Sequence, residues 1–206
     1  MEIENKAKNI SLEEEIERTK RIKGNGIGAA VLSHLYFIRE KEGEEGVKKV
    51  EARLRELGYN IDFNEIKSME RVPLAFSYMV VLAAREIFNW SDKDIFEMGN
   101  SAPKYSFIVK MLLKYFISLK DIFRQAANGW EKHYDVGELE SYKFNEREKY
   151  MILRLKHECP PTICLFYCGY FLRLAQYGLK GGGITIEETK CVNRGDTHHE
   201  FLIKWK

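Results

Sequence analysis

The chain has 206 residues, of which 45% are hydrophobic and 31% are charged. Its 33 basic and 31 acidic side chains leave a net charge of +2, which argues against direct nucleic-acid binding. Residues 1–8 are polar and give no sign of a secretion signal. The longest apolar stretch, residues 72–84, is shorter than the roughly 20 residues that a membrane-spanning helix needs. We therefore expect a cytoplasmic globular protein.

Helical patterns dominate the chain up to about residue 130. Ser11 with Glu14 predicts a capping box that opens a short charged helix within residues 1–23. Three glycines at positions 24, 26 and 28 predict a flexible joint after it. Apolar residues at helical spacing then predict helices over residues 29–40, 44–57, 73–88 and 110–127, and Ser91 predicts the cap of another.

The pattern changes after Gly129. Residues 139–144 and 150–157 read as two strands, and residues 184–191 and 199–205 as two more. Between the pairs, residues 162–179 form a helix that is apolar on most sides and is therefore expected to be buried on most sides. The predicted fold class is α+β. A helical portion (24–130) is followed by a four-stranded antiparallel sheet (131–206) in the order β-β-α-β-β, crossed by a buried helix.

Four side chains in the last third suit a zinc ion: Cys164, Glu188, Cys191 and His199. Cys191 and His199 are equidistant from Gly195, so a hairpin with its tip there places them opposite one another. Glu188 would point to the other face of a regular strand, so it joins them only if the strand has a bulge or ends near Lys190. Buried core cysteines and surface histidines are the alternative interpretation.

The stretch from Cys164 to Gly169-Tyr170, followed by Glu188-Thr-Lys-Cys191, resembles the end of a 4-vinyl-reductase-type domain. This family includes the sensor domains of aromatic-responsive bacterial transcription activators, which bind a structural zinc. The resemblance implies zinc bound by Cys164, Glu188 and Cys191, with His199 in place of a final cysteine. It is carried by residues 130–206 and implies one ligand-binding domain over residues 24–206.

The resemblance also implies a sensor for an apolar or aromatic small molecule, held between the helices and the sheet. Aromatic side chains of the predicted helical portion suit such a pocket, although each one also suits a core. The candidates are Phe76, Tyr78, Phe107, Tyr115, Phe116, Phe123, Trp130 and Tyr134. Members of the family dimerise through N-terminal segments, which implies a homodimer with residues 1–23 as an arm. Because no DNA-binding unit is recognisable, we expect a separate signalling partner.

The wider superfamily includes haem-based nitric-oxide sensors and subunits of a vesicle-tethering complex. The haem branch needs an axial histidine and a Tyr-x-Ser-x-Arg clamp; the clamp is not found, and His34 and His133 are isolated candidates, so we expect no haem. Catalytic motifs are also not found, which favours binding over enzymatic activity. The alternatives are a scaffold subunit without a soluble ligand, which a filled core would favour, and a reductase-associated enzyme.

Overall fold

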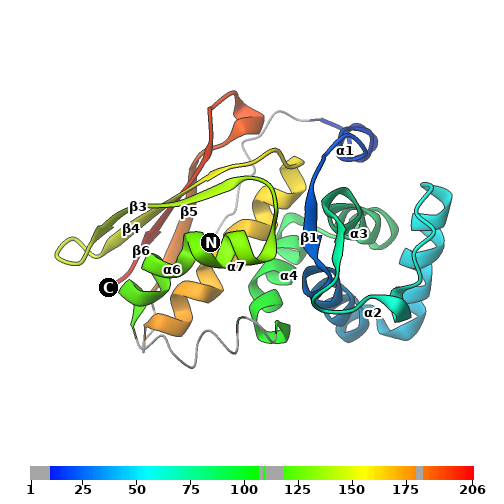
Figure 1. Cartoon of the computed structure of the whole chain (residues 1–206), viewed down its shortest axis with the longest axis horizontal. Coiled ribbons are helices and arrows are strands. Elements are labelled where there is room, and N and C mark those ends of the chain that lie inside the picture. The colour runs from blue at the N-terminus through cyan, green and yellow to red at the C-terminus, as the bar shows by residue number, and fades with distance from the viewer. Residues whose placement is uncertain (1–9, 107–108, 110–117, 180–182) are drawn as a thin grey trace.

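A computed structural model describes residues 10–106, 109, 118–179 and 183–206. Figure 1 shows a twisted sheet with two helices beneath it on one side of the molecule and a group of helices on the other. The expected α+β class is confirmed, and so is the order of strands and helix in the last third. The helices and strands thus fall into two neighbouring halves, and the buried helix of the last third lies between them.

The sheet has four antiparallel strands in the order β3-β4-β6-β5. Its strands are β3 (Glu138–Asn145), β4 (Tyr150–Lys156), β5 (Thr185–Lys190) and β6 (His199–Lys204). Two helices, α6 (Leu119–His133) and α7 (Pro161–Gly178), cover one face. The ring of Phe123 on α6 lies 5.4 Å from Phe144, and Phe171 on α7 lies 4.9 Å from Phe201. Alternate residues of β4 face these helices, which explains its period-two burial, whereas on β6 Glu200 is buried as well as its neighbours His199 and Phe201.

Helix α7 crosses α4 (Asp92–Tyr105) with almost no space between the two backbones. A Cβ atom added at Gly99 would lie 1.9 Å from the Phe166 carbonyl oxygen, and one at Gly169 would lie 2.0 Å from the Phe96 carbonyl oxygen. Only glycine leaves room for so close an approach. Gly169, part of the motif on which the family resemblance rests, therefore has a packing role: it sets the distance between α4 and α7.

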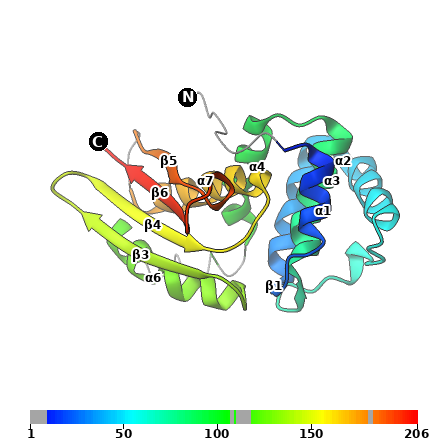
Figure 2. The ribbon, with the colours of Figure 1, turned by 90° about the horizontal axis from the view of Figure 1, so that it is seen from above.

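From residue 10 to Phe88 the chain forms three α-helices, one short 3-10 helix and a two-stranded ribbon. These are α1 (Leu12–Thr19), β1 (Asn25–Ile27), α2 (Gly28–Glu56), the short helix η1 (Phe63–Glu65), β2 (Arg71–Pro73) and α3 (Leu74–Phe88). The two helices expected over residues 29–57 are joined into α2, with non-helical geometry at Gly43 (φ 72°). Figure 2 shows α1 lying along α3.

The glycines at positions 24, 26 and 28 do not form the expected flexible joint. Strand β1 pairs with β2, and Gly26 also bridges to Tyr134 beside α6. A Cβ atom at Gly28 would lie 2.2 Å from the Lys67 carbonyl oxygen. The prediction was wrong because these glycines permit close packing of an ordered strand rather than freedom of the backbone.

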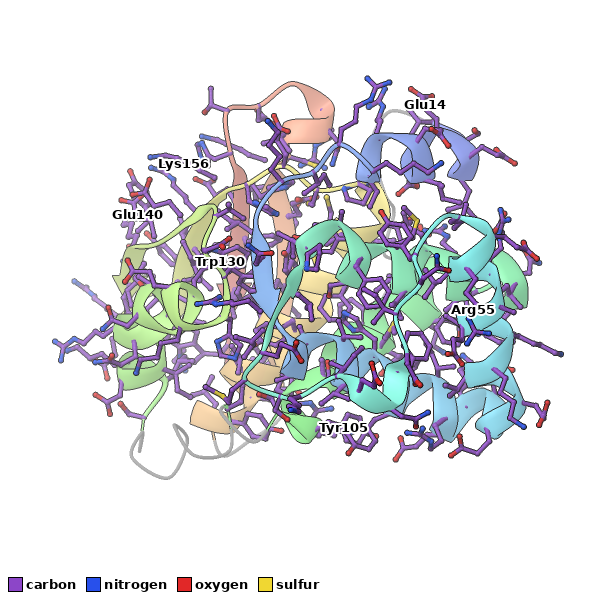
Figure 3. All side chains as sticks on the ribbon, turned by 45° about the vertical axis from the view of Figure 1, so that its right-hand side comes forward. Glu14, Arg55, Tyr105, Trp130, Glu140 and Lys156 are labelled. Atoms are coloured by element: carbon purple, nitrogen blue, oxygen red, sulfur yellow. The ribbon has the colours of Figure 1, made fainter. Side chains whose placement is uncertain are left out.

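Charged side chains lie on the surface of the molecule. Figure 3 shows Glu14, Arg55 and Lys156 projecting from it.

The helix expected over residues 110–127 lies partly outside the described residues; α6 begins at Leu119 and runs on to His133. Among the described helices, none combines the length and the apolar character that crossing a bilayer requires.

Candidate metal centre and ligand cavity

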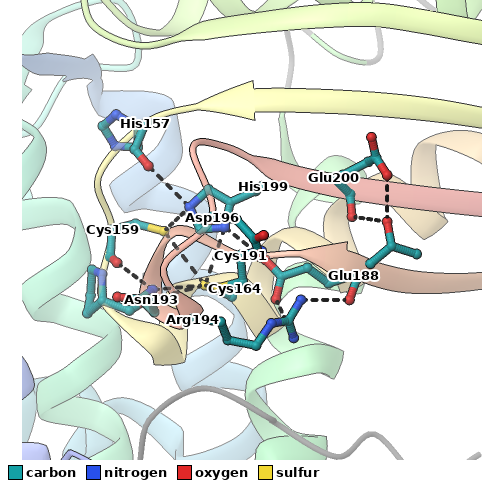
Figure 4. Close-up of polar contacts among 12 residues, drawn as sticks. His157, Cys159, Cys164, Glu188, Cys191, Asn193, Arg194, Asp196, His199 and Glu200 are labelled. Atoms are coloured by element: carbon teal, nitrogen blue, oxygen red, sulfur yellow. Dashed lines mark hydrogen bonds and ion pairs between the residues drawn. The ribbon is translucent and has the colours of Figure 1, made fainter.

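The four predicted metal ligands converge at one end of the sheet. One donor atom from each of Cys164, Glu188, Cys191 and His199 lies within 4.8 Å of every other. Cys164 comes from the first turns of α7, and the other three come from β5, its end and the start of β6 (Figure 4). The side chains of Cys164, Cys191 and His199 are at most 2% exposed. The cluster is therefore shielded from bulk water.

A β-bulge brings Glu188 into this cluster. The register between β5 and β6 shifts between Glu188 and Lys190, as the sequence required for Glu188 and Cys191 to share a face. Cys191 follows the strand and precedes a short helical turn, η2 (Val192–Arg194), and its N–H donates to the Asp196 carboxylate at 2.8 Å. The hairpin tip thus holds Cys191 beside His199 by backbone geometry as well as by packing.

Hydrogen bonds orient the imidazole of His199. Its Nε2 donates to the carbonyl oxygen of His157 at 3.1 Å, and its Nδ1 faces Glu188 Oε1 at 2.8 Å. Nδ1 also lies 3.8 Å from the Cys164 thiol. Metal-binding histidines commonly donate their second ring N–H to a backbone carbonyl. Nδ1 is therefore the nitrogen that this arrangement leaves for a cation.

The electrostatics of the cluster differ between its thiols and its imidazole. Burial on its own would lower the pKa of His199, but contacts with Cys164, Cys191 and Glu188 outweigh burial and raise the pKa to about 12. The adjacent Cys159 thiol and burial raise the pKa of Cys164 well above its usual value. A divalent ion bound here would have to displace protons from the cluster, so its affinity would depend on pH.

The distances fit a tetrahedral zinc shell. Zinc–sulfur bonds of about 2.3 Å place two thiolates about 3.8 Å apart, and Cys164 Sγ lies 3.7 Å from Cys191 Sγ. Asn193 Nδ2 donates to Cys164 Sγ at 3.4 Å, and Arg194 lies 3.9 Å from Glu188 Oε2. These two side chains would stabilise a thiolate and a carboxylate. A fifth group, Cys159, lies 3.9 Å from Cys164 Sγ and was not among the predicted ligands.

A first cavity lies between α6 and α7. It has a volume of about 80 Å³. Its wall is mainly aromatic and aliphatic, with Trp130, Tyr134, Phe166, Tyr167, Tyr170, Phe171 and Leu174 among its residues. An interior space of this composition suits an apolar ligand.

A second, smaller cavity adjoins the first. Its volume is about 30 Å³. It reaches α2 through Ser33 and His34, α3 through Ser77 and Tyr78, and α4 through Ala102. Both cavities share His133, Tyr134 and three residues of α7, namely Phe166, Tyr167 and Tyr170. The shared wall means that a ligand larger than either cavity would join the two by displacing these rings.

Two buried histidines supply unpaired nitrogen atoms to these cavities. His133 Nδ1 lies 2.7 Å from the Gly129 carbonyl oxygen and must carry the proton, so Nε2 holds a lone pair. Neither His133 Nε2 nor His34 Nδ1 has a hydrogen-bond partner among the described residues, although both are buried. Burial lowers the pKa of His133, and it lowers that of His34 to about 3, so both rings are neutral near pH 7. Buried polar atoms are rarely left unsatisfied, so these two nitrogen atoms are candidates for contact with a ligand.

The predicted pocket residues divide into three groups. Trp130, Tyr134 and Tyr78 line the cavities. Phe76 and Phe123 are buried in the core and do not line either cavity. Phe107, Tyr115 and Phe116 lie outside the described residues.

The sequence interpretation missed the contribution of α7 to the pocket. Phe166, Tyr167, Tyr170 and Phe171 project from this helix into the cavity wall, and His133 joins them from α6. The signal was present in residues 162–179, which are apolar on most sides of the helix. Such a helix still has an apolar side left to line a cavity after it has packed on a sheet and on α4.

Comparison with known proteins identifies the fold. No family model matches the sequence, and none of the curated proteins matches it. The structure is similar to an H-NOX protein from S. oneidensis in the Fe(II)NO ligation state, with a TM-score of 0.66, 12% identity, and coverage of 87% of this chain and 99% of the other. It is also similar to the Fe(II) unliganded H-NOX protein from K. algicida (TM-score 0.62, 13% identity, 87% and 96% covered). A third similar structure is an oxygen-binding H-NOX domain related to soluble guanylate cyclases (TM-score 0.62, 12% identity, 87% of this chain and 94% of the other covered).

These neighbours correct the expectation that haem is absent. They are described in Fe(II) and Fe(II)NO states, and another similar structure comes from work on heme distortion in the H-NOX family. The expectation rested on a missing Tyr-x-Ser-x-Arg motif. At 12–14% identity a fold can persist without any one short motif, so the missing motif does not exclude haem. The chain has the fold of the H-NOX domains.

Proposed function

We propose that the chain is a sensor domain that binds an apolar small molecule in the two adjoining cavities, with haem as the first candidate. The observation that carries this proposal is the lone pair of His133 Nε2, buried in an aromatic wall and unpaired among the described residues. A neutral imidazole whose Nδ1–H is held by a backbone carbonyl is a ligand for iron. Bound haem would supply an iron atom able to bind a diatomic gas.

The chemistry of the lining residues suits haem, but the volume of the two cavities is too small for it. His133, Trp130 and the tyrosines of α7 provide a nitrogen donor and flat apolar walls. Both cavity volumes are below the roughly 300–1,000 Å³ of most ligand pockets. A molecule as large as haem therefore has to move the shared wall of Phe166, Tyr167 and Tyr170. The chain's own contribution would be to hold the ligand at His133 and to exclude water from it.

Titration of the purified protein with haemin, followed by reduction, tests this proposal. We expect one equivalent to bind and to give the absorption spectrum of histidine-ligated haem, and we expect His133→Ala to lose that spectrum. The matched variant His34→Ala alters the second cavity and should retain it. If haemin does not bind but a smaller aromatic compound does, the ligand is of the type implied by the 4-vinyl-reductase resemblance. If neither binds, the scaffold alternative is favoured.

We propose in addition that Cys164, Glu188, Cys191 and His199 bind a structural zinc ion. Support comes from the two thiols 3.7 Å apart, from Nδ1 of His199 facing them, and from the burial of the site. Glu188 Oε1 now lies 2.8 Å from Nδ1, so the two must separate by about 0.5 Å to bind one ion. Zinc would join β5, β6 and α7 and so stabilise the wall of the cavity.

Other expectations stay predictions from the sequence. They are the kinship with 4-vinyl-reductase-type sensors, homodimerisation through residues 1–23, and a separate signalling partner. In the structure, Ile16 of α1 is buried in the core, and Glu15 accepts the backbone N–H of Thr162 at 2.9 Å. An arm that dimerises would therefore use the exposed face of α1.

A further inference from the structure

We propose that His157 is a positioning residue that couples the metal centre to the ligand cavity, so that each site changes the affinity of the other. This inference rests on the proposed function, because it needs a cation at one site and a ligand at the other. Two features of the structure support the coupling. The first is a set of hydrogen bonds that links the two sites through the backbone and ring of His157, and the second is helix α7, which carries residues of both sites.

The hydrogen bonds begin at His199. Its Nε2 donates to the backbone carbonyl of His157 at 3.1 Å, and the imidazole of the same His157 lies 2.7 Å from the Tyr78 hydroxyl. The Tyr78 hydroxyl lies in turn 2.6 Å from the hydroxyl of Tyr167. Tyr167 lines both cavities, and Tyr78 lines the second. Three contacts within hydrogen-bonding distance thus connect His199, a candidate metal ligand, to Tyr167 in the cavity wall.

Helix α7 provides a second, covalent connection. Cys164 and Tyr167 are three residues apart and therefore neighbours on its surface. Gly99 and Gly169 allow this helix to pack tightly against α4. A displacement of Cys164 is carried to Tyr167 by the helix, and a displacement of His199 is carried to Tyr167 through His157 and Tyr78.

Metal binding would act on both connections at once. A zinc ion draws Cys164 and His199 to bonding distances from one centre, at about 2.3 and 2.0–2.1 Å. The His157 carbonyl follows the Nε2–H of His199, and the ring of His157 sets the position of the Tyr78 and Tyr167 hydroxyls. A ligand that contacts Tyr167 moves the same groups from the opposite end. Linkage requires the two effects on affinity to be equal.

Zinc affinity measured by competition with a chromophoric chelator tests the coupling in full-length variants. Tyr78→Phe and Tyr167→Phe remove hydroxyls of the set without touching a metal ligand, and we expect zinc to bind about 3- to 10-fold more weakly. The control is Tyr177→Phe. Tyr177 lies on the same helix, is 40% exposed and lines neither cavity. We expect its affinity for zinc to stay within twofold of the unaltered protein.

A variant can also bind zinc more weakly because it is less stable, so a second measurement uses the unaltered protein alone. In the unaltered protein, adding zinc should shift the NMR resonances of the Tyr167 ring, which is not a ligand, and should leave those of an exposed ring such as Tyr36 in place. If the unaltered protein binds no zinc, the metal centre itself is refuted. If zinc binds tightly and equally to all variants, and the Tyr167 resonances do not move, the metal centre stands and the coupling is refuted.

Discussion

The thiol of Cys164 lies 3.7 Å from the thiol of Cys191, although 27 residues separate them along the chain. One comes from a helix that crosses under the sheet and the other from the tip of its last hairpin. That separation matches the spacing of two thiolates on one zinc ion. Two buried thiols at this distance, beside a carboxylate and an imidazole, suit a metal ion.

Replacing one of these thiols should abolish tight zinc binding. We expect Cys164→Ser to weaken zinc binding by about 100-fold or more, since loss of even an outer-shell partner costs about 10- to 100-fold. Chelator competition and metal analysis after dialysis measure this. Cys168→Ser is the matched control, because Cys168 is buried one turn along the same helix and outside the cluster. Equal affinities in the two variants would contradict the site.

The crossing of α4 and α7 makes a second prediction. Gly169→Ala would place a methyl group against the Phe96 carbonyl, so we expect a loss of about 3 kcal/mol or more in the free energy of unfolding. Gly129→Ala on α6 has no neighbouring atom within 4 Å and should stabilise the protein by up to about 1 kcal/mol. Urea denaturation compares the two. Similar stabilities would show that the helices can separate without cost.

His34 makes the fold sensitive to acid. Burial lowers its pKa from 6.5 to about 3, whereas in the unfolded chain it titrates near 6.5. The unfolded state therefore takes up a proton first as the pH falls, and stability present above pH 6.5 is lost towards pH 3 at about 1.4 kcal/mol per unit. His34→Gln should lose less stability than the unaltered protein between pH 5.5 and 4.5. Parallel loss in both proteins, measured by urea denaturation, would contradict this.

A side chain that fills the first cavity should block the ligand. Ala126 lies on α6 in the cavity wall. We expect Ala126→Phe to lower haemin affinity by about 10-fold or more while the melting temperature stays the same or rises, because the ring replaces empty space with contacts. Absorption titration and thermal denaturation measure the two effects. Unchanged haemin affinity would place the ligand elsewhere.

The sequence allowed the last third to be predicted closely. Strong alternation in β4 and continuous apolar character in α7 specify a strand and a buried helix by burial alone. The four candidate ligands were identified by residue type and by symmetry about Gly195. The sequence also indicated that Glu188 could join the other ligands only at a bulge or at the end of its strand, because a regular strand would turn that carboxylate away from Cys191. The structure has the bulge.

The cavities were harder to predict because they depend on tertiary packing. The histidine lone pairs of His34 and His133 become notable only once burial leaves them without partners. The Tyr78–Tyr167 hydrogen bond joins residues 89 positions apart, and no local pattern announces it. The missing Tyr-x-Ser-x-Arg motif argued against haem, whereas the fold is similar to that of H-NOX proteins described in Fe(II) states. The glycine-rich segment at residues 24–28 forms strand β1 through contacts with β2 and Tyr134, which are distant in the sequence.

Native mass spectrometry of the protein, expressed with zinc and haem precursor supplied, tests the central claim most directly. The proposed sensor predicts a mass equal to the chain plus one zinc ion plus one small molecule, and predicts that His133→Ala loses the molecule but keeps the ion. A mass equal to that of the bare chain under these conditions would contradict both the ligand cavity and the metal centre.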